Sequence, residues 1–233
     1  MITMKLVWSP ETACEAYIDT VKLCENFKES SVAELLSAMA AGWNAKLIVE
    51  AWSYGGPMPT SIGLAVAARH TSARHVCVVP DERSRLAYVK GMYESGISAT
   101  EVIVREAEEA MVELVGVDFL VVDNKRKDFG RIFRFAKFSN KGAVLVCKNA
   151  SQRSFGSRNI SGLRWNGVLE SGTRVVRSVF LPVGQGLDMA HVGSSNGNRE
   201  ESLKKSPTRS RWIKHIDQRS GEEHVFRGNF MPR

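Results

Sequence analysis

The alternation of short apolar runs with helical patterns is the feature that most constrains how this chain can fold. Five apolar runs rich in β-branched residues lie at Lys46–Ala51, His75–Val79, Glu101–Val104, Val117–Val122 and Ala143–Cys147. The helical patterns between them lie at Thr60–Arg69, Asp81–Ser95, Ala107–Val115 and Phe129–Phe138. Strands that are apolar along their whole length are buried on both faces, so the pattern predicts a parallel sheet with helices on either side.

Two further helices are expected before the first strand. Ser9-Pro10-Glu11 combines an N-cap serine, a proline in the first turn and an acid near the positive end of the helix dipole. This helix is expected to run to about Asn26. Ser31-Val-Ala-Glu34 has the pattern of a capping box, which predicts a second helix ending near Gly42.

The last strands are of a different kind. The polar segment Ser151–Ser161 is predicted to be a loop, and Arg174–Leu181 and Leu187–Val192 then form an antiparallel hairpin at the sheet edge. We therefore expect an α/β chain: a Rossmann-like three-layer sandwich whose mostly parallel seven-stranded sheet is closed by this hairpin. The domain is predicted to span 1–193, with its N-terminal helices in 1–43.

The charge is unevenly distributed along the chain. The net charge is +7. Residues 194–233 hold nine Lys/Arg and five Asp/Glu, which leaves 23 basic and 20 acidic residues in the first 193. We expect 194–233 to be a basic, largely disordered tail, with a segment at 210–227 that docks on the domain. Any nucleic-acid partner would bind through this tail, because the domain itself is only mildly basic.

Cysteine usage and hydropathy indicate the compartment. The four cysteines form no CxxC pair, and Cys77 and Cys147 lie inside apolar runs, as expected for small buried side chains in a reducing environment. The N-terminus lacks the apolar core of a signal peptide, and the chain has no run of 18 apolar residues. The sequence therefore predicts a cytoplasmic or nuclear protein without a membrane partner.

Polar residues follow every apolar strand, where ligands bind in open α/β sheets. The residues at these strand ends are Glu50, Ser53, Gly55, Gly56, Asp81, Glu82, Glu106, Asp123, Lys148 and Asn149. Each also has a structural interpretation. Asp81 suits a helix N-cap, Asp123 an ion pair, Lys148 a side chain extended to water, and Gly55-Gly56 a tight turn.

Signatures of several other enzyme classes are missing from the sequence. The five histidines have no metal-ligand spacing, and there is no P-loop, nucleophile elbow or zinc motif. A nicotinamide-dependent reductase is the weakest of the enzyme hypotheses, because the first turn lacks GxGxxG and the second strand does not end in an acid.

Four motifs in register resemble class I S-adenosylmethionine (SAM)-dependent methyltransferases, most closely the catechol and caffeoyl-CoA O-methyltransferases. LIVEAWSYGGPMPTSIGLAVAA resembles their first motif, VDFLVVDNKRKDFGRIF their fourth strand, acid and helix, GAVLVCKNA their fifth strand, and VFLPVGQGLDMAHV their closing hairpin. The whole chain is also similar to a plant family described as a domain of unknown function with a methyltransferase-like fold.

The resemblance implies roles for the residues at the strand ends. Glu50 would face the methionine amine of SAM, and the loop with Ser53, Gly55 and Gly56 would pass beneath the cofactor. Asp81 or Glu82 would bind the ribose and Glu106 the adenine side. Asp123 and Lys148 would border the acceptor as the catalytic pair, with Asp123 also touching the cofactor.

The departures from the family pattern concern the first motif and the metal site. Trp52 stands where the family has its first glycine, and its indole is expected to obstruct the backbone's approach to a ligand. Lys148 replaces a metal-binding aspartate, and an ammonium repels a divalent cation, so no metal is predicted. Two hypotheses remain: a metal-independent SAM-dependent methyltransferase for an unknown small-molecule or protein acceptor, and a non-catalytic binding or scaffold protein on the same fold.

Overall fold

Seven helices and eleven strands make up the part of the chain that the computed structural model describes, which is 8–27, 31–97, 100–150, 163–193 and the backbone of 211–216 and 223–228. The helices are α1 (Pro10–Leu23), α2 (Val32–Gly42), α3 (Met58–Thr71), α4 (Glu82–Glu94), α5 (Ala107–Glu113), α6 (Phe129–Phe135) and α7 (Trp165–Val168). The strands are β1 (Leu47–Ala51), β2 (Arg74–Val79), β3 (Glu101–Val104), β4 (Val115–Val117), β5 (Phe119–Asp123), β6 (Lys137–Phe138), β7 (Ala143–Lys148), β8 (Val175–Leu181), β9 (Leu187–Val192), β10 (Arg211–Ile216) and β11 (Glu223–Gly228).

Seven of the strands form one sheet in the order β3-β2-β1-β5-β7-β9-β8. The first five of these are parallel, and β9 runs antiparallel to both β7 and β8. This confirms the predicted Rossmann-like α/β fold with a closing hairpin. The strand order changes direction between β1 and β5, and open α/β sheets form their ligand-binding crevice outside the carboxyl ends of the strands at such a switch point.

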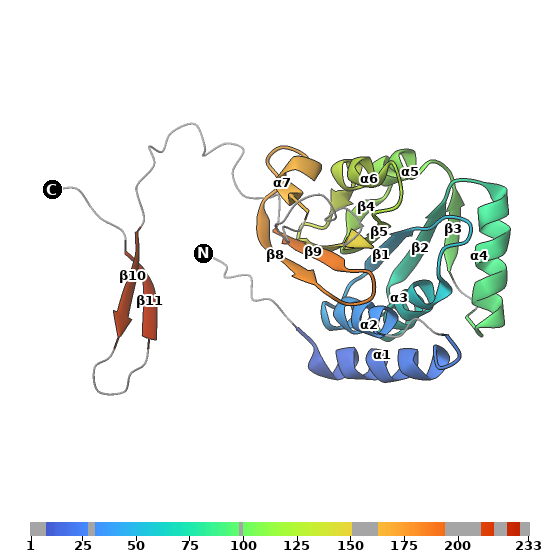
Figure 1. Ribbon diagram of the computed structural model, residues 1–233, viewed down its shortest axis with the longest axis horizontal. Coiled ribbons are helices and arrows are strands. Elements are labelled where there is room, and N and C mark those ends of the chain that lie inside the picture. Colours follow the sequence, from blue (N-terminus) through green and yellow to red (C-terminus); the bar gives the residue numbers. More distant parts are fainter. Residues whose placement is uncertain are drawn as a thin grey trace. The chain divides into compact units, whose positions relative to one another are not determined.

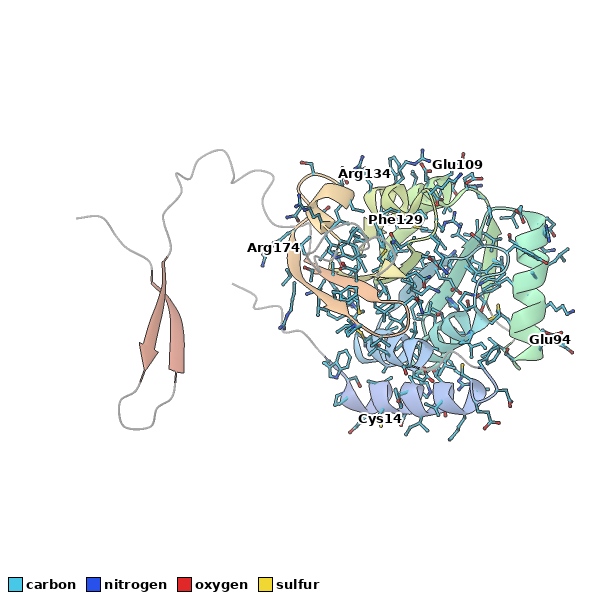
Figure 2. The ribbon with its side chains drawn as sticks, viewed as in Figure 1. Cys14, Glu94, Glu109, Phe129, Arg134 and Arg174 are labelled. Carbon is cyan, nitrogen blue, oxygen red and sulfur yellow. The ribbon has the colours of Figure 1, made fainter. Side chains whose placement is uncertain are left out.

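Helices cover both faces of the sheet (Figure 1). Side chains alternate along each strand, so Ile48 and Val121 pack with α2 and α3, whereas Val49 and Leu120 pack with α5 and α6. Along the described chain, α1 packs on α2 and α3 rather than on the sheet, and Cys14 lies on its outer side (Figure 2). The layers are therefore packed mainly by apolar side chains, with a few buried polar groups such as Glu50 and Asp188.

Trp165 anchors the short helix α7 on the α5–α6 face. Its ring packs edge to face on Phe133, with 5.1 Å between centroids, and its Nε1 donates to Asp188 Oδ1 at 2.7 Å. Burial raises the pKa of Asp188, and it outweighs the hydrogen bonds from Leu163 N and Trp165, which lower that pKa. The Asp188 carboxylate thereby ties Leu163 and α7 to β9.

Several element boundaries differ from the sequence predictions. The helices expected to reach Val115 and Phe138 end at Glu113 and Phe135, because Val115–Val117 and Lys137–Phe138 pair as a small parallel sheet. β-branched residues favour that extended conformation. The expected capping box is also absent, since Ser31 has a φ of 83° and its side chain makes no cap hydrogen bond. The predicted loop Ser151–Ser161 lies outside the described residues.

Two compact units divide the chain, Met1–Ser195 and Asn196–Arg233. In the second unit, β10 and β11 form an antiparallel hairpin within the segment for which docking is predicted. The largely disordered tail and the docking of 210–227 stay predictions. Within the described residues, no helix is both long enough and apolar enough to cross a membrane.

Gly63 sets how closely α2 and α3 approach each other. A Cβ at this position would lie 2.6 Å from the backbone oxygen of Ala33, which cannot move without shifting α2. We expect Gly63→Ala to lower the free energy of unfolding by about 1–3 kcal/mol through overpacking. Gly130→Ala is the matched control, because its Cβ would meet nothing closer than 3.9 Å.

The control substitution is expected to stabilise the protein by about 0.4–1 kcal/mol, since alanine restricts the unfolded chain in a helix that has room for it. Urea unfolding of the two variants measures both effects. Equal changes in stability for Gly63→Ala and Gly130→Ala would contradict the close approach of α2 and α3.

Candidate functional site

The polar ends of three neighbouring strands meet at one edge of the sheet. β1 pairs with β5, and β5 pairs with β7 in a register that places Asp123 opposite Lys148. Ser53 follows β1 by two residues on the other side of the switch point. Three of the predicted site residues therefore lie around the crevice between β1 and β5.

Asp123 and Lys148 are both engaged by neutral groups. Asp123 Oδ1 accepts from Lys125 N at 2.8 Å, and its Oδ2 accepts from Asn149 Nδ2 at 2.7 Å. Lys148 Nζ donates to Thr60 Oγ1, in the first turn of α3, at 3.3 Å. No ion pair of Asp123 is found among the described residues. The two side chains are thus oriented by the loop after β7 and by α3.

The turn after β1 is open on its outer side. Gly56 N donates to Ser53 O at 2.9 Å, and Gly55 has a φ of 80°, a backbone conformation that suits glycine. A Cβ at Gly55 would meet no atom within 4 Å, so open space adjoins this residue. Helix α3 follows at once, with no side-chain cap and no acid in its first turn.

Trp52 lies beneath this turn, on the face that carries α3 and α4. Its side chain packs edge to face on Tyr88, with 5.4 Å between ring centroids, and belongs to a core cluster with Ile62 and Val79. A Cβ at Gly56 would come within 2.7 Å of Trp52 Nε1. The indole therefore occupies the space under the loop. Residue 56 must be glycine because a Cβ there would collide with the indole.

Glu50 is held inside the same face, away from solvent. Its Oε1 accepts from Tyr88 Oη at 2.6 Å and its Oε2 accepts from Ser61 Oγ at 2.8 Å. His75 Nε2 lies 3.2 Å from Oε1, off the line of a regular hydrogen bond. Burial alone would raise the pKa of Glu50, but contacts with His75, the Tyr88 hydroxyl and the charge of Lys148 outweigh it and lower that pKa.

The predicted ribose and adenine residues lie at the ends of β2 and β3. Asp81 is the N-cap of α4, accepting from Ser84 N at 2.7 Å, as one interpretation of the sequence predicted. Glu82 forms an exposed ion pair with Arg85. Glu106 is exposed at the start of α5. These three acids follow β2 and β3, which lie on one side of β1 in the sheet. Asp123 and Lys148 end β5 and β7, which lie on the other side.

Arg126 is a site residue that the sequence did not reveal. Its guanidinium donates to Ser53 Oγ at 2.6 Å and pairs with both oxygens of Asp128. The only local signal is the run Lys125-Arg126-Lys127 after an apolar strand, which reads as a solvated surface. A contact across 73 residues leaves no trace in local sequence patterns.

Two buried polar atoms near this edge of the sheet lack hydrogen-bond partners. Within the described chain, Trp52 Nε1 and Asn124 Oδ1 are buried without hydrogen-bond partners. Unpaired buried polar atoms are rare and costly, and Glu34 Oε2, His75 Nε2 and Ser84 Oγ are further examples among the described residues, so these atoms do not by themselves mark a ligand site. Among those same residues, no group of three His, Cys, Asp or Glu side chains is arranged to hold a metal ion.

A family model described as "Protein of unknown function (DUF1442)" matches residues 4–228. The chain belongs to this family. A search of curated proteins found no match to the DUF1442 chain. The family match confirms the predicted resemblance to a family of unknown function. The strand order and the solved structures confirm the predicted methyltransferase-like fold.

Solved structures similar to the DUF1442 chain are methyltransferases. One from Podospora anserina, bound to S-adenosylhomocysteine (SAH), is 16% identical with a TM-score of 0.54, covering 80% of this chain and 90% of its own. An O-methyltransferase of tomaymycin synthesis from Streptomyces achromogenes, in complex with SAM, is 21% identical (TM-score 0.53; 77% and 90%). An O-methyltransferase from Bacillus cereus, in complex with SAH, is 18% identical (TM-score 0.52; 80% and 93%). At these identities the likeness establishes the fold.

Proposed function

We propose that the DUF1442 chain is a SAM-dependent methyltransferase that works without a metal ion. The observation that carries the proposal is the open turn at Gly55 beside Ser53, Asp123 and Lys148, at the switch point of the sheet. The same fold holds SAM or SAH in the solved neighbours. A nucleotide-like ligand at this edge would span from the acids after β2 to the Asp123–Lys148 pair.

The residues at the site fit the cofactor. The bulky Trp52 is turned into the core beneath the loop, so the outer side of the Gly55 turn stays free for a ligand. Helix α3 has no side-chain cap at its amino end, where Pro59 contributes no N–H group, so the positive end of its dipole is what would favour an anionic group of the ligand. Asp81 and Glu82 are exposed at the end of β2, where hydroxyls of a ribose would find acceptors.

Methyl transfer places modest demands on the protein. SAM supplies an electrophilic methyl group, which forms a bond to the acceptor as its bond to sulfur breaks. The protein aligns the acceptor with that methyl group and keeps the acceptor's attacking atom electron-rich. Lys148 Nζ, now on Thr60 Oγ1, would hold an acceptor oxygen in its anionic form, the task that a divalent cation performs elsewhere.

Calorimetry with SAM and SAH tests the proposal directly. Binding of either ligand with a Kd below about 1 mM, accompanied by a rise in melting temperature, is the expected result. ATP serves as the control for nonspecific binding of an adenine nucleotide. The absence of both binding heat and a thermal shift at millimolar SAM or SAH would reject the proposed function.

Lys148→Ala should separate cofactor binding from catalysis. We expect transfer of labelled methyl from SAM to a panel of phenols and carboxylic acids to fall by about 100-fold or more, because the acceptor oxygen loses its cationic partner. The Kd for SAH should change by less than about threefold, since Lys148 faces the acceptor side. The matched control is Lys137→Ala, an exposed lysine on β6. Unchanged turnover in Lys148→Ala would remove this lysine from the mechanism.

A second candidate, a non-catalytic binding or scaffold protein, is favoured by the state of the predicted cofactor acids. Both oxygens of Glu50 are used inside the core, Asp81 caps α4, and Glu82 pairs with Arg85. Both oxygens of Asp123 also accept hydrogen bonds. SAH binding without any methyl transfer across the acceptor panel would support this candidate over the enzyme.

A further inference from the structure

A largely buried arginine side chain connects the two loops at the switch point of the sheet. Arg126, in the loop between β5 and α6, donates from Nη1 to the hydroxyl of Ser53, in the loop after β1. The donor and acceptor are 2.6 Å apart. These loops flank the crevice, so the hydrogen bond fixes their separation where a ligand would lie.

Asp128 locks the guanidinium in place. Arg126 Nε and Nη2 donate to the two carboxylate oxygens at 2.9 and 2.7 Å. The side chains of Arg126 and Asp128 are only 11% and 15% exposed. A bidentate pair of this kind fixes the plane of the guanidinium, which a lysine could not reproduce. The third nitrogen is thereby aimed at Ser53.

The contact with Arg126 leaves the Ser53 hydroxyl with a proton to donate. A serine hydroxyl has one donor and two acceptor lone pairs, and the guanidinium occupies one lone pair. In the described chain, Ser53 Oγ donates to no acceptor. A cation bound to the oxygen polarises the O–H bond, so Ser53 becomes a stronger donor.

The surroundings of Ser53 favour a negatively charged acceptor. Ser53 begins the turn that leads into the uncapped amino end of α3, a 14-residue helix without an acid in its first turn. The positive end of the dipole and the exposed Lys125 and Lys127 beside Arg126 add to the positive potential. An anionic group of a ligand would be stabilised here.

We propose that Arg126 is a positioning residue, which presents the Ser53 hydroxyl as a fixed donor to the carboxylate of the bound cofactor. This inference rests on the proposed function, because SAM and SAH carry that carboxylate on their amino-acid end. Ser53 contacts the ligand, Arg126 acts through Ser53, and Asp128 holds Arg126. The assignment orients the cofactor, with its amino-acid end over β1 and β5 and its adenosine toward β2 and β3.

Calorimetry with two ligands tests the assignment. SAH has the carboxylate, whereas 5′-methylthioadenosine is the same adenosyl thioether without the amino-acid end. We expect Ser53→Ala to weaken SAH binding about tenfold or more, the effect of losing a hydrogen bond to a charged group. Arg126→Gln should act in the same direction. The affinity for 5′-methylthioadenosine should stay within about twofold in both variants.

A double variant and two controls complete the test. Ser53→Ala combined with Arg126→Gln should bind SAH no more weakly than the weaker single variant, because the two residues act in series. Ser53→Thr keeps a hydroxyl and should retain affinity within about threefold. Lys137→Ala removes an exposed cation on β6, outside the loop that carries Arg126, and should change SAH affinity by less than about threefold.

The outcomes separate the inference from the proposed function. Equal losses for both ligands, or losses that add in the double variant, would overturn the carboxylate assignment and leave Arg126 as a support for the loop. Wild-type protein that binds 5′-methylthioadenosine as tightly as SAH would overturn it as well, while leaving adenosyl binding intact. Wild-type protein that binds neither ligand would reject both proposals.

Discussion

Trp52→Ala is expected to lower the free energy of unfolding by about 3–5 kcal/mol. The side chain is 6% exposed and packs on Tyr88, so its removal leaves a cavity between the sheet and α4. The substitution also removes the indole that supports Gly56 from below, which loosens the turn. Urea unfolding monitored by circular dichroism measures the loss.

The matched control is Tyr93→Ala, an aromatic residue on the outer side of α4. Tyr93 is 79% exposed, and its removal should change stability by less than about 0.5 kcal/mol. A small loss for Trp52→Ala, comparable to that of Tyr93→Ala, would mean that the indole does not pack in the core. The indole would then be able to obstruct the approach of a ligand to the loop, as expected from the sequence.

Glu50→Ala should lower the free energy of unfolding by a similar amount, about 3–5 kcal/mol, because it removes a buried carboxylate and leaves its hydrogen-bond donors unpaired. Tyr88 and Ser61 both donate to this carboxylate, and His75 lies beside it. The hydroxyls of Tyr88 and Ser61 would lose their acceptor in an apolar layer, and His75 its neighbouring charge. Thermal unfolding at neutral pH gives the size of the effect.

The same carboxylate gives the protein a dependence on acid. The pKa of Glu50 is lowered in the folded state relative to an unfolded value of about 4.3. Its stabilising contribution is therefore complete above the unfolded pKa and is lost as the pH falls through the folded pKa. Glu50→Gln removes that ionisation, so its stability should fall less steeply below about pH 4 than that of the wild type.

Glu94→Gln is the control for the acid dependence, because Glu94 pairs with Lys90 on the exposed side of α4. Its stability curve should follow that of the wild type within about 0.5 kcal/mol. If stability falls with equal slope below about pH 4 in the wild type and in Glu50→Gln, then other carboxylates govern acid unfolding.

The strands and the edge of the sheet could be predicted from the sequence because both depend on local patterns. A continuous apolar run such as Ala143–Cys147 is specific to a strand buried on both faces, and the register of parallel strands then brings Asp123 opposite Lys148. The N-cap at Asp81 follows equally from local chemistry, since its side chain bonds to an amide three residues on.

The side-chain partners across the sheet could not be predicted. Glu50 reads as a residue at a strand end, yet its side chain is committed to Tyr88, 38 residues away, on the face of α4. Arg126 finds Ser53 only because β1 and β5 are neighbours. The sequence predicts that Trp52 obstructs the loop, but its indole packs instead in the core cluster with Tyr88, a residue far from it in the sequence.

Trp52 and Trp165 are buried on opposite faces of the same sheet, which supplies the chain with two intrinsic fluorophores for two layers. With the remaining tryptophans replaced by phenylalanine, emission from Trp52 would follow the layer of α3 and α4, and emission from Trp165 the layer of α5 to α7. Acidification removes the stabilising charge of Glu50, whose pKa is lowered, from the first layer. Protonation of Asp188 beside Trp165 does not weaken the second layer, because the pKa of that carboxyl is raised, so a red shift from Trp52 should come before one from Trp165. The order of the two shifts would reveal which side of the sheet comes apart first.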